Sequence, residues 1–497
     1  MKLSGKSILL FSVFFVLFNC ASTDNLRFPE TPKDELTKEI DFLVTDPNLF
    51  NAQVGIFIES LNDGRVIYRS NEHKSFIPAS NMKLYTTACA LRNLKPDFKL
   101  KTSFYTIDKP SGGELASDLI IRGSGDPGIS GRFRDDDMYA CLKDWADSLK
   151  KDGIYKLTGN LVGDISLFGG PEVRAGWEWD DMPYYYAAQI SALSFNDNCV
   201  DLLISPGKDI GDSVTIKTQP DIDYIKIINT VKTVHPDSLT DLNIWRERGR
   251  NVVYVSGSVH AGSEIKRDYV TVENPALLLL KTFAKVLKDN GIEFDGELCI
   301  NEDKSKFRYD SLNVLFEYPS QPLSKLVEVV NKNSNNFFAE QLFSVLGLIN
   351  FEDGSQKNGV KTVSRLLNSM GIPPGEINIV DGSGLARQNL VSPFSTVSVL
   401  RTMYKSSVFD DFFNSLPIAG VDGTLKNRMK KSPAENNVHA KTGYVANTRS
   451  LSGYAKDADG KNYAFSMMFN NYLVPTAYIN DLQDKICILL STYHSGT

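Results

Sequence analysis

Three short motifs hold the residue types of an activated serine nucleophile: Ser80–Lys83 (Ser-Asn-Met-Lys), Ser334–Asn336 (Ser-Asn-Asn) and Lys441–Gly443 (Lys-Thr-Gly). A serine hydroxyl attacks a carbonyl poorly until a base takes its proton, and a lysine can be that base only when burial or a second cation lowers its pKa. Each motif alone is weak, because Ser148–Lys151 also fits Ser-x-x-Lys and Ser-x-Asn recurs elsewhere. The three together, in this order, predict a serine acyl-transfer site.

The first motif is expected at the start of a helix. An apolar run with helical spacing follows Pro78, and proline is common at the first helical position. Ser80 would then lie in the first turn, where free N–H groups and the helix dipole favour developing negative charge. Lys83 would lie on the same face as the Ser80 hydroxyl, and Lys441 would be the second cation. The apolar run comprises Met82, Tyr85, Ala88, Cys89 and Leu91.

The other two motifs are expected at a helix–helix corner and on a strand. Ser334 and Asn336 stand between two runs with helical periodicity, so that a hydroxyl and an amide can point together into a cleft. Lys441–Gly443 lies in an extended stretch, and alternating apolar residues farther on predict more strands. Gly443 would let a substrate backbone approach closely. The helical runs are 323–330 and 337–342, and the extended segments are 438–445, 451–455 and 463–469.

The spacing of the motifs indicates a large insertion. Ser80 and Ser334 are 254 residues apart (334 − 80), and between about residue 100 and residue 265 the chain carries short strand-like runs and few helical ones. A hairpin before Ser80 and an amphipathic C-terminal helix would complete a discontinuous α/β core. The hairpin is expected at 54–68, insertion strands at 119–122, 157–162 and 253–259, a helix at 275–290 and the last helix around 479–489.

The chain resembles the class C low-molecular-mass penicillin-binding proteins, the D-alanyl-D-alanine carboxypeptidases/endopeptidases of serine peptidase family S13. The resemblance covers nearly the whole mature chain. Besides the three motifs, it rests on the segments Arg122–Pro127, Gly163–Ser166, Gly176–Asp181, Tyr184–Tyr186, Ala192–Asp197, Asp381–Leu385 and Asp422–Leu425.

The resemblance implies a transpeptidase/β-lactamase-like core, with an antiparallel sheet flanked by helices, and a large, mainly β insertion that forms two further domains. The expected core comprises residues 23–100 and 308–497. The second domain would comprise residues 101–185 and 265–307, and the third residues 186–264. In β-lactamases and simple carboxypeptidases the second motif lies much closer to the first, so the long spacing favours this subfamily.

The resemblance also implies a mechanism. Ser80 would attack the carbonyl between the two terminal D-alanines of a peptidoglycan stem peptide while Lys83 takes its proton. Ser334, linked to Lys83 or Lys441, would pass a proton to the leaving amine, and water would release the acyl group. A penicillin would acylate Ser80 and stay, because its leaving group cannot diffuse away. The remaining expected roles are the substrate amide for Asn336, the terminal carboxylate for Lys441 with Thr442, and the oxyanion hole for the N–H groups of Ser80 and Tyr444.

In this family a pocket between the core and the insertion receives the far end of the peptide side chain. The matching residues are Trp177, Asp180 and Tyr185 from the insertion and Leu385 and Arg387 from the core. Asp180 would pair with a free amine such as that of diaminopimelate. The alternative is a structural cluster of aromatic residues in which Asp180 caps a turn.

Two other functions fit parts of the pattern. A β-lactamase would share the acyl-serine chemistry, but the long insertion and the lack of an obvious deacylating glutamate disfavour it. A non-catalytic wall-binding protein would be expected to lose a motif residue, and none is lost. His439 suggests a serine–histidine–acid site, but a strand residue two positions from Lys441 is more often structural, and Lys83 already fills the role of base.

The N-terminus indicates an exported protein. The apolar run Ile8–Phe18 follows two lysines and is too short to span a bilayer of ~30 Å, which predicts a signal peptide within residues 1–22. Cys20 stands where lipoproteins carry their lipidated cysteine, so we expect a periplasmic protein with membrane attachment through lipid; a cut near Ser22 is the alternative.

The composition argues against several other classes of protein. The net charge is −6 and no basic patch is evident, which disfavours nucleic acid as a partner. No Cys/His spacing suits a metal, and no cofactor is expected. The cysteines are too few and too unevenly spaced for a disulfide framework.

Overall fold

A five-stranded antiparallel sheet joins the two ends of the chain. The computed structural model describes residues 35–495. In the order β2-β1-β22-β21-β20, the N-terminal hairpin pairs through β1 with β22, which confirms the expected hairpin and the expected strands around and after the Lys-Thr-Gly motif. The strands are β1 (Gln53–Ser60), β2 (Val66–Ser70), β20 (His439–Val445), β21 (Thr448–Lys456) and β22 (Asn462–Asn470).

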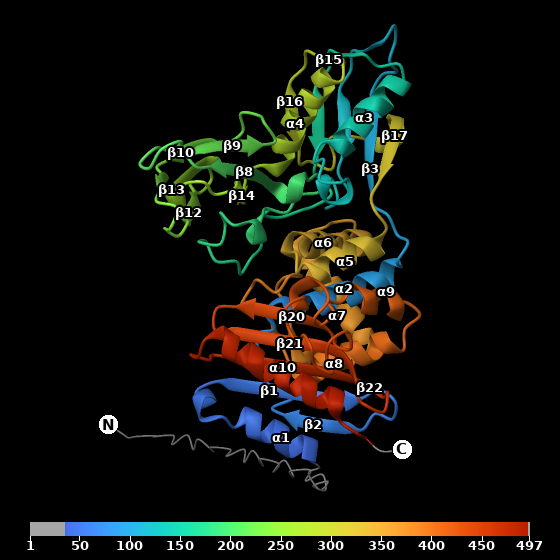
Figure 1. Ribbon diagram of the computed structural model, residues 1–497. Helices are drawn as coiled ribbons and strands as arrows, with labels where there is room; N and C mark the ends of the chain where they lie inside the picture. The colour runs from blue at the N-terminus through green and yellow to red at the C-terminus, as the bar shows by residue number, and fades with distance from the viewer. Residues whose placement is uncertain (1–34, 496–497) are drawn as a thin grey trace, which may run out of the picture.

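Helices cover both faces of this sheet. Successive residues of a strand point to opposite faces, so Met467 packs with the terminal helices α1 and α10, whereas Met468 packs with the helical layer around α2. Figure 1 shows α10 lying along the sheet. Burial on both faces explains why β22 is apolar along most of its length. The helices are α1 (Glu35–Val44), α2 (Met82–Leu94), α8 (Pro393–Tyr404) and α10 (Thr476–Thr492).

Helix α2 is the centre of the helical layer. Its residues Met82–Leu91 are all buried, because five helices, α5 to α9, pack around it. A helix enclosed in this way buries even its polar side chains, which places the Lys83 amine in the interior. The surrounding helices are α5 (Leu323–Lys332), α6 (Asn336–Phe351), α7 (Gln356–Ser369), α8 and α9 (Phe409–Ser415); a short ribbon of β18 (Ile377–Asn378) and β19 (Leu390–Val391) follows α7.

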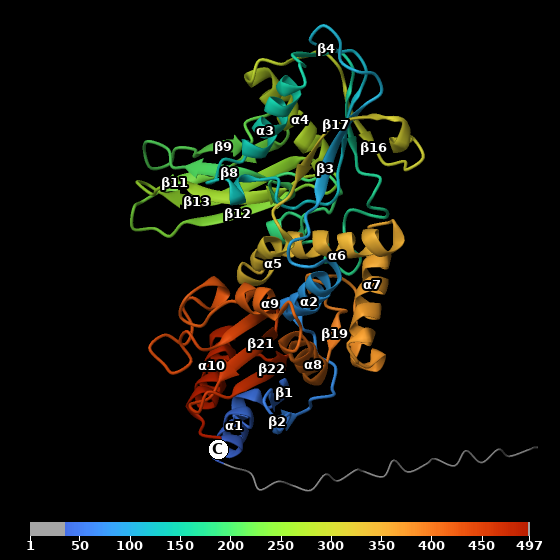
Figure 2. The ribbon, with the colours of Figure 1, turned by 90° about the vertical axis from the view of Figure 1, so that its right-hand side faces the viewer.

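The chain between α2 and α5 forms the insertion, which stands over the helical layer (Figure 2). Its first sheet, β16-β7-β5-β3-β17, packs with two helices around Trp145, whose ring centroid lies 5.0 Å from that of Phe104 and 5.4 Å from that of Phe283. The expected helix at 275–290 is confirmed as α4, and α3 is an additional one. The elements are β3 (Lys101–Thr106), β5 (Leu119–Arg122), β7 (Leu161–Asp164), β16 (Leu298–Asn301), β17 (Asn313–Pro319), α3 (Ala140–Lys151) and α4 (Pro275–Asp289).

One expected strand is broken in two. The run 157–162 turns at Gly159, where an added Cβ would lie 2.2 Å from the carbonyl oxygen of Ser117. Its first part, β6 (Lys156–Leu157), therefore joins a small sheet with β4 (Glu114–Leu115) and β15 (Glu293–Phe294), while β7 stays in the first sheet.

Two more sheets form the far part of the insertion. One has the order β14-β8-β9, and in the other β13 pairs with β10, β11 and β12. Val253, Val255 and Val259 of β13 are buried, which confirms the strand expected at 253–259. The strands are β8 (Cys199–Ser205), β9 (Thr215–Gln219), β10 (Lys226–Asn229), β11 (Lys232–Val234), β12 (Asp241–Arg246), β13 (Val252–His260) and β14 (Lys266–Thr271).

The domain boundaries within the insertion stay predictions, and two strands bear on where they fall. β17 follows residue 308 but pairs with β3, and β14 follows residue 264 but pairs with β8. Each of these strands belongs to a sheet that begins on the other side of an expected boundary.

Candidate active site

Ser80 lies in a tight turn at the N-terminal end of α2. The turn is a 3₁₀ helix, Ala79–Asn81, that runs directly into α2, so the expected helix start is confirmed. Ala79 is buried and has a left-handed φ of 46°, a strained conformation that persists only where the surroundings fix it. Strand β21 supplies part of that support, because Ser450 Oγ donates a hydrogen bond to the carbonyl oxygen of Pro78 at 2.6 Å.

The Lys83 amine lies at the centre of the site. Its Nζ is 2.9 Å from Ser80 Oγ, 2.6 Å from Asn336 Oδ1 and 2.7 Å from the carbonyl oxygen of Ser383. A neutral amine has two N–H donors and one lone pair. When the amide oxygen and the carbonyl oxygen take both donors, the lone pair points at the Ser80 hydroxyl and can accept its proton.

Burial makes the neutral form of this amine accessible. It lowers the pKa of Lys83 from 10.5 to about 7, against the opposing charges of Asp381 and Glu340. Burial and then the charge of Lys83 also lower the pKa of Lys441 well below its ordinary value. Burial therefore accounts for the lowered pKa of Lys83, whereas the sequence had assigned part of this effect to Lys441 as a second cation.

Ser334 stands at the expected corner between α5 and α6, with a left-handed φ of 56°. Lys441 Nζ donates to Ser334 Oγ at 2.8 Å and to the carbonyl oxygen of Thr442 at 2.8 Å. The sequence left open whether Ser334 would contact Lys83 or Lys441, and the structure shows Lys441.

The insertion holds the second motif directly. Asn336 Nδ2 donates to the carbonyl oxygen of Tyr186 at 2.8 Å, and Asn335 Nδ2 donates to Asp197 Oδ2 at 2.8 Å. Asn335 Oδ1 also caps α6 by accepting from the amide of Phe338. Sequence reasoning gave these contacts no role, although Tyr184–Tyr186 and Ala192–Asp197 belong to the segments that carry the resemblance.

Gly443 is required by the protein's own backbone. An added Cβ would lie 2.1 Å from Ser450 Oγ, 2.6 Å from the Pro78 carbonyl oxygen and 3.1 Å from the Ser80 nitrogen. These contacts within the protein already require a glycine here, and the expected approach of a substrate backbone to Gly443 stays a prediction. The following residue, Tyr444, is 56% exposed.

Thr442 has a partner that the sequence did not predict. Its Oγ1 donates to Thr424 Oγ1 at 2.8 Å, and Thr424 lies in the short 3₁₀ helix Gly423–Leu425. Both threonines line the same cavity as Ser80. The signal for Thr424 was its place in the segment Asp422–Leu425.

A cavity of about 1230 Å³ lies between the core and the insertion. Ser80, Ser334 and Asn336 line it from the helical layer, and Thr442 and Tyr444 line it from β20. Carboxylates of the insertion and guanidinium groups of both parts of the chain contribute to the rest of the lining. They are Asp136, Glu178, Asp181, Asp197, Asp201, Arg132 and Arg267 of the insertion, and Arg387 and Arg449 of the core.

The residues expected in the side-chain pocket divide into two groups. Tyr185, Leu385 and Arg387 line the cavity. Trp177 does not: it is buried, and its Nε1 donates to Asp381 Oδ2 at 3.0 Å. Asp180 does not line the cavity either, because the chain turns here and leaves it exposed, while the next residue, Asp181, is half-buried and faces the cavity.

His439 has a structural environment. Its ring stacks on Phe413 with 4.0 Å between ring centroids, and burial and then the charge of Lys332 lower its pKa to about 4. A base this weak is poorly matched to proton abstraction at neutral pH, which agrees with the choice of Lys83 over a histidine.

The part of the chain that the structure describes also bears on metal ligands, membrane-spanning helices and disulfides. Within residues 35–495, no group of three or more His, Cys, Asp or Glu side chains could hold a metal ion, and no helix is long and apolar enough to cross a membrane. The five cysteines in this range are free thiols. The signal segment and Cys20 lie outside the described residues.

Comparison with known proteins covers both the core and the insertion. Residues 36–493 match the D-Ala-D-Ala carboxypeptidase 3 (S13) family. A D-alanyl-D-alanine carboxypeptidase of Actinomadura sp. is 30% identical over 470 residues, 92% of this chain and 85% of the relative. The D-alanyl-D-alanine carboxypeptidase DacB of Haemophilus influenzae is 27% identical over 432 residues, 85% of this chain and 86% of the relative. The crystal structure of penicillin binding protein 4 (dacB) from Haemophilus influenzae superposes with a TM-score of 0.79 at 26% identity, covering 91% of this chain and 99% of that one.

Proposed function

Because the chain belongs to the D-Ala-D-Ala carboxypeptidase 3 (S13) family, we propose that it cleaves D-Ala-terminated peptidoglycan stem peptides through an acyl-enzyme on Ser80. The protein is a hydrolase of the serine type. The observation that carries the assignment of Ser80 is its contact with Lys83 Nζ at 2.9 Å, where Asn336 Oδ1 and the Ser383 carbonyl oxygen orient the amine.

Acylation begins when Lys83 takes the Ser80 proton and Oγ bonds to the carbonyl carbon between the two D-alanines. The negative charge on the carbonyl oxygen would be held by the N–H groups of Ser80 and Tyr444. The close approach of Gly443 to the Ser80 nitrogen supports this pairing, because it brings β20 against the Ser80 turn. Losing one such donor typically slows the reaction by about 10²–10³-fold.

The C–N bond then breaks, and the departing D-alanine needs a proton on its amine. Ser334 is the proposed donor, since Lys441 hydrogen-bonds its hydroxyl at 2.8 Å. Water next attacks the ester, and Ser80 recovers its proton as the shortened peptide leaves. Lys83 is the proposed base for this water too.

The other motif residues would hold the substrate. Asn336 uses one N–H for the insertion, which leaves its second N–H for the substrate amide carbonyl. Lys441 and Thr442 would hold the terminal carboxylate, with Thr424 oriented next to Thr442 by their hydrogen bond. Thr442 gives its hydroxyl proton to Thr424, which keeps its own proton for a carboxylate beside the Lys441 amine.

We also assign endopeptidase activity to the same site. The cavity of about 1230 Å³ is lined by residues of both the core and the insertion, and this size supports a substrate larger than a single stem peptide. The test is product analysis on purified cross-linked muropeptides: we expect release of D-alanine from pentapeptides and of monomers from dimers. Release of D-alanine without release of monomers would contradict the endopeptidase activity. Release of neither product would contradict the proposed function as a whole.

β-Lactams enter as substrate mimics. A penicillin should acylate Ser80 and remain bound, because the ring-opened leaving group stays attached and blocks the return of water. A β-lactamase, the alternative from the same chemistry, would instead turn the drug over rapidly. The match of residues 36–493 to a carboxypeptidase family favours the lasting adduct.

Acylation by penicillin should rise with pH through about 7. The neutral amine of Lys83 is the reactive form and its pKa is about 7, so each pH unit below this value should lower the rate about 10-fold. The check is the second-order acylation rate of a fluorescent penicillin from pH 5 to 9. A flat profile over this range, on protein that stays folded, would contradict Lys83 as the base.

Asp181→Asn should weaken binding of stem peptides with a free side-chain amine. Asp181 lines the cavity and accepts a hydrogen bond from Tyr186 at 2.9 Å, whereas Asp180 is exposed outside the cavity. Loss of a charge-assisted hydrogen bond should raise KM about 10-fold for the free amine and little for its acetylated form. Asp180→Asn is the matched control, and the reverse result would restore the role expected from the sequence.

Export and lipid attachment are proposals from the N-terminal sequence together with the family's cell-wall substrate. A signal within residues 1–22 and lipidation of Cys20 would place the protein in the periplasm, tethered to a membrane. The intact mass of the mature protein should show acyl chains that Cys20→Ser removes. A mature chain that begins near Ser22 and carries no lipid would contradict the anchor.

A further inference from the structure

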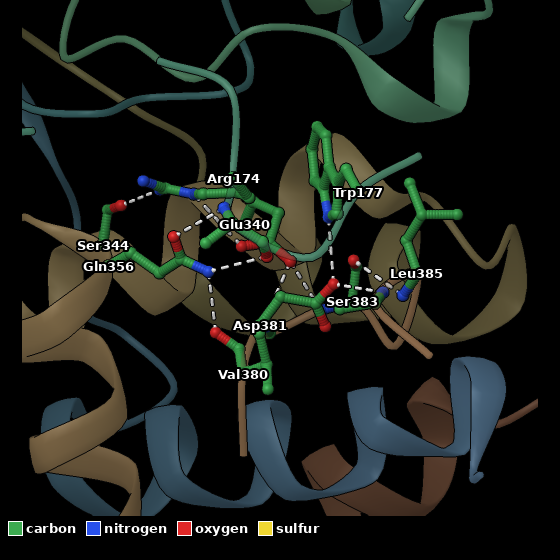
Figure 3. A network of polar contacts seen from close by, with 12 residues as sticks. Arg174, Trp177, Glu340, Ser344, Gln356, Val380, Asp381, Ser383 and Leu385 are labelled. Carbon is green, nitrogen blue, oxygen red and sulfur yellow. Dashed lines mark hydrogen bonds and ion pairs between the residues drawn. The ribbon is translucent and has the colours of Figure 1, made fainter. Parts of the chain in front are cut away.

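Two carboxylates lie fully buried beside the nucleophile helix (Figure 3). Asp381 belongs to the loop between β18 and β19, and Glu340 belongs to α6. Neither is a motif residue, and neither lines the cavity. Buried carboxylates are costly unless hydrogen bonds compensate them, so their contacts show what they hold in place.

Asp381 fixes the shape of its own loop. One carboxylate oxygen accepts from the amide of Gly384 at 2.7 Å and from Asn389 Nδ2 at 2.7 Å. The other accepts from the amide of Ala386 at 2.7 Å and from Trp177 Nε1 at 3.0 Å. Four donors converge on one side chain, which explains why the indole expected in the side-chain pocket is turned inward.

Glu340 holds the same loop from the opposite side. Its Oε1 accepts from the amides of Gly382 and Ser383, at 2.9 and 2.7 Å. Its Oε2 lies 3.4 Å from Arg174 Nε, and both side chains of this pair are buried. Arg174 therefore stabilises the charged form of Glu340, and the other oxygen of this carboxylate, Oε1, orients the loop.

The loop in turn rests on the nucleophile helix through three consecutive residues. The Gly382 carbonyl oxygen accepts from Thr86 Oγ1 at 2.7 Å, and the Ser383 carbonyl oxygen accepts from Lys83 Nζ at 2.7 Å. A Cβ added to Gly384 would lie 1.9 Å from the carbonyl oxygen of Ala79. The chain of contacts thus runs from Glu340 through the Ser383 peptide to the amine of the base.

We propose that Glu340 is a positioning residue for the Lys83 base: it fixes the Ser383 carbonyl against the lysine amine and supplies negative charge that offsets the burial of that amine. The inference rests on the proposed function. Helix geometry supports it, because Asn336 and Glu340 are four residues apart and share one face of α6. Asn336 supplies one acceptor for Lys83 directly, and Glu340 holds the other through Ser383.

The charges around Lys83 come from three elements. Glu340 of α6 and Asp381 of the loop both raise its pKa, and Lys441 of β20 shares the buried site. Burial and then the charge of Asp381 raise the pKa of Glu340 to about 7, against the opposing charge of Arg174, so the Glu340 anion predominates above that pH. Removing the charge of Glu340 leaves the Lys83 ammonium less compensated, so the lysine should lose its proton at lower pH.

Two substitutions separate the effect of the Glu340 charge from the effect of its position against the loop amides. Glu340→Gln keeps an oxygen acceptor for the loop amides and removes the charge. Glu340→Asp keeps the charge and withdraws the acceptor by one methylene. The matched control is Glu59→Gln on β1, which also neutralises a buried glutamate paired with an arginine, Arg401 at 2.6 Å. The readout is the acylation rate by a fluorescent penicillin from pH 5 to 9, together with the unfolding temperature.

We expect Glu340→Gln to move the midpoint of the pH profile about 1 unit lower. Glu340→Asp should keep the midpoint and lower the plateau about 10-fold or more, since a base misplaced by about 1 Å transfers protons poorly. Glu59→Gln should change neither. A merely structural role would reduce the amount of folded enzyme and leave the midpoint where it is.

An unchanged midpoint in Glu340→Gln would overturn the inference, and so would an unchanged plateau in Glu340→Asp. If the glutamine variant does not fold, the plateau rate of the aspartate variant alone tests the inference. Absence of any adduct on the parent would overturn the proposed function and the inference with it. Acylation of the parent with no effect of either variant would overturn the inference alone.

Discussion

Lys83→Met should slow acylation by penicillin about 10³-fold or more while the protein remains folded. The base is lost, and general-base catalysis is typically worth about 10²–10⁴-fold. Methionine is an unbranched apolar side chain, so it suits a fully buried position and leaves no unpaired charge. The measurement is the second-order acylation rate with a fluorescent penicillin, taken at pH 8, where the parent amine is mostly neutral.

Lys151→Met is the control for this variant. Lys151 ends the other Ser-x-x-Lys sequence, Ser148–Lys151, but it lies exposed at the end of α3 in the insertion. Its loss should leave the acylation rate unchanged. A Lys83→Met enzyme that retains a tenth or more of the parent rate would show that another group takes the Ser80 proton.

Gly384→Ala should disable the site by moving the Ser80 turn. Gly384 has a φ of 85°, and an added Cβ would lie 1.9 Å from the carbonyl oxygen of Ala79. Alanine is strained at this φ, and the contact is with backbone, which cannot rotate away. We expect acylation to fall about 100-fold, because a shift of about 1 Å in a reacting group has effects of this size, together with a lower unfolding temperature.

The matched control is Gly375→Ala in the short 3₁₀ helix after α7. No atom lies within 4 Å of a Cβ built there, and its φ is not left-handed. This variant should acylate at the parent rate with equal or slightly higher stability. A Gly384→Ala enzyme as active as Gly375→Ala would contradict the dependence of the Ser80 turn on this loop.

The sequence predicted the elements that carry the three motifs because each has a local signal. Proline before an apolar run placed the start of α2, and alternation of apolar residues placed β21 and β22. The sequence could not decide whether Ser334 would contact Lys83 or Lys441. A contact across 107 residues depends on how the helical layer packs on the sheet, which no local pattern records.

The features that the sequence could not predict have a common physical origin. The sequence explained Gly443 by the approach of a substrate, but it could not show that the Ser80 turn, which becomes adjacent only after folding, also requires a glycine there. Asp180 and Asp181 are neighbours in sequence, and a turn decides which one faces the cavity. Glu340 gave no signal on its own, since a glutamate in an apolar helix is identified as functional only when its partners are known.

The central claim is that Ser80 forms the acyl-enzyme. The most direct test is intact-protein mass spectrometry after incubation with benzylpenicillin, on the parent and on Ser80→Ala. We predict one penicilloyl adduct on the parent, located by peptide mapping to the segment that contains Ser80, and none on the variant. An adduct that persists on Ser80→Ala, or a folded parent that neither gains an adduct nor consumes the drug, would contradict the account, and rapid turnover without a lasting adduct would identify a β-lactamase instead.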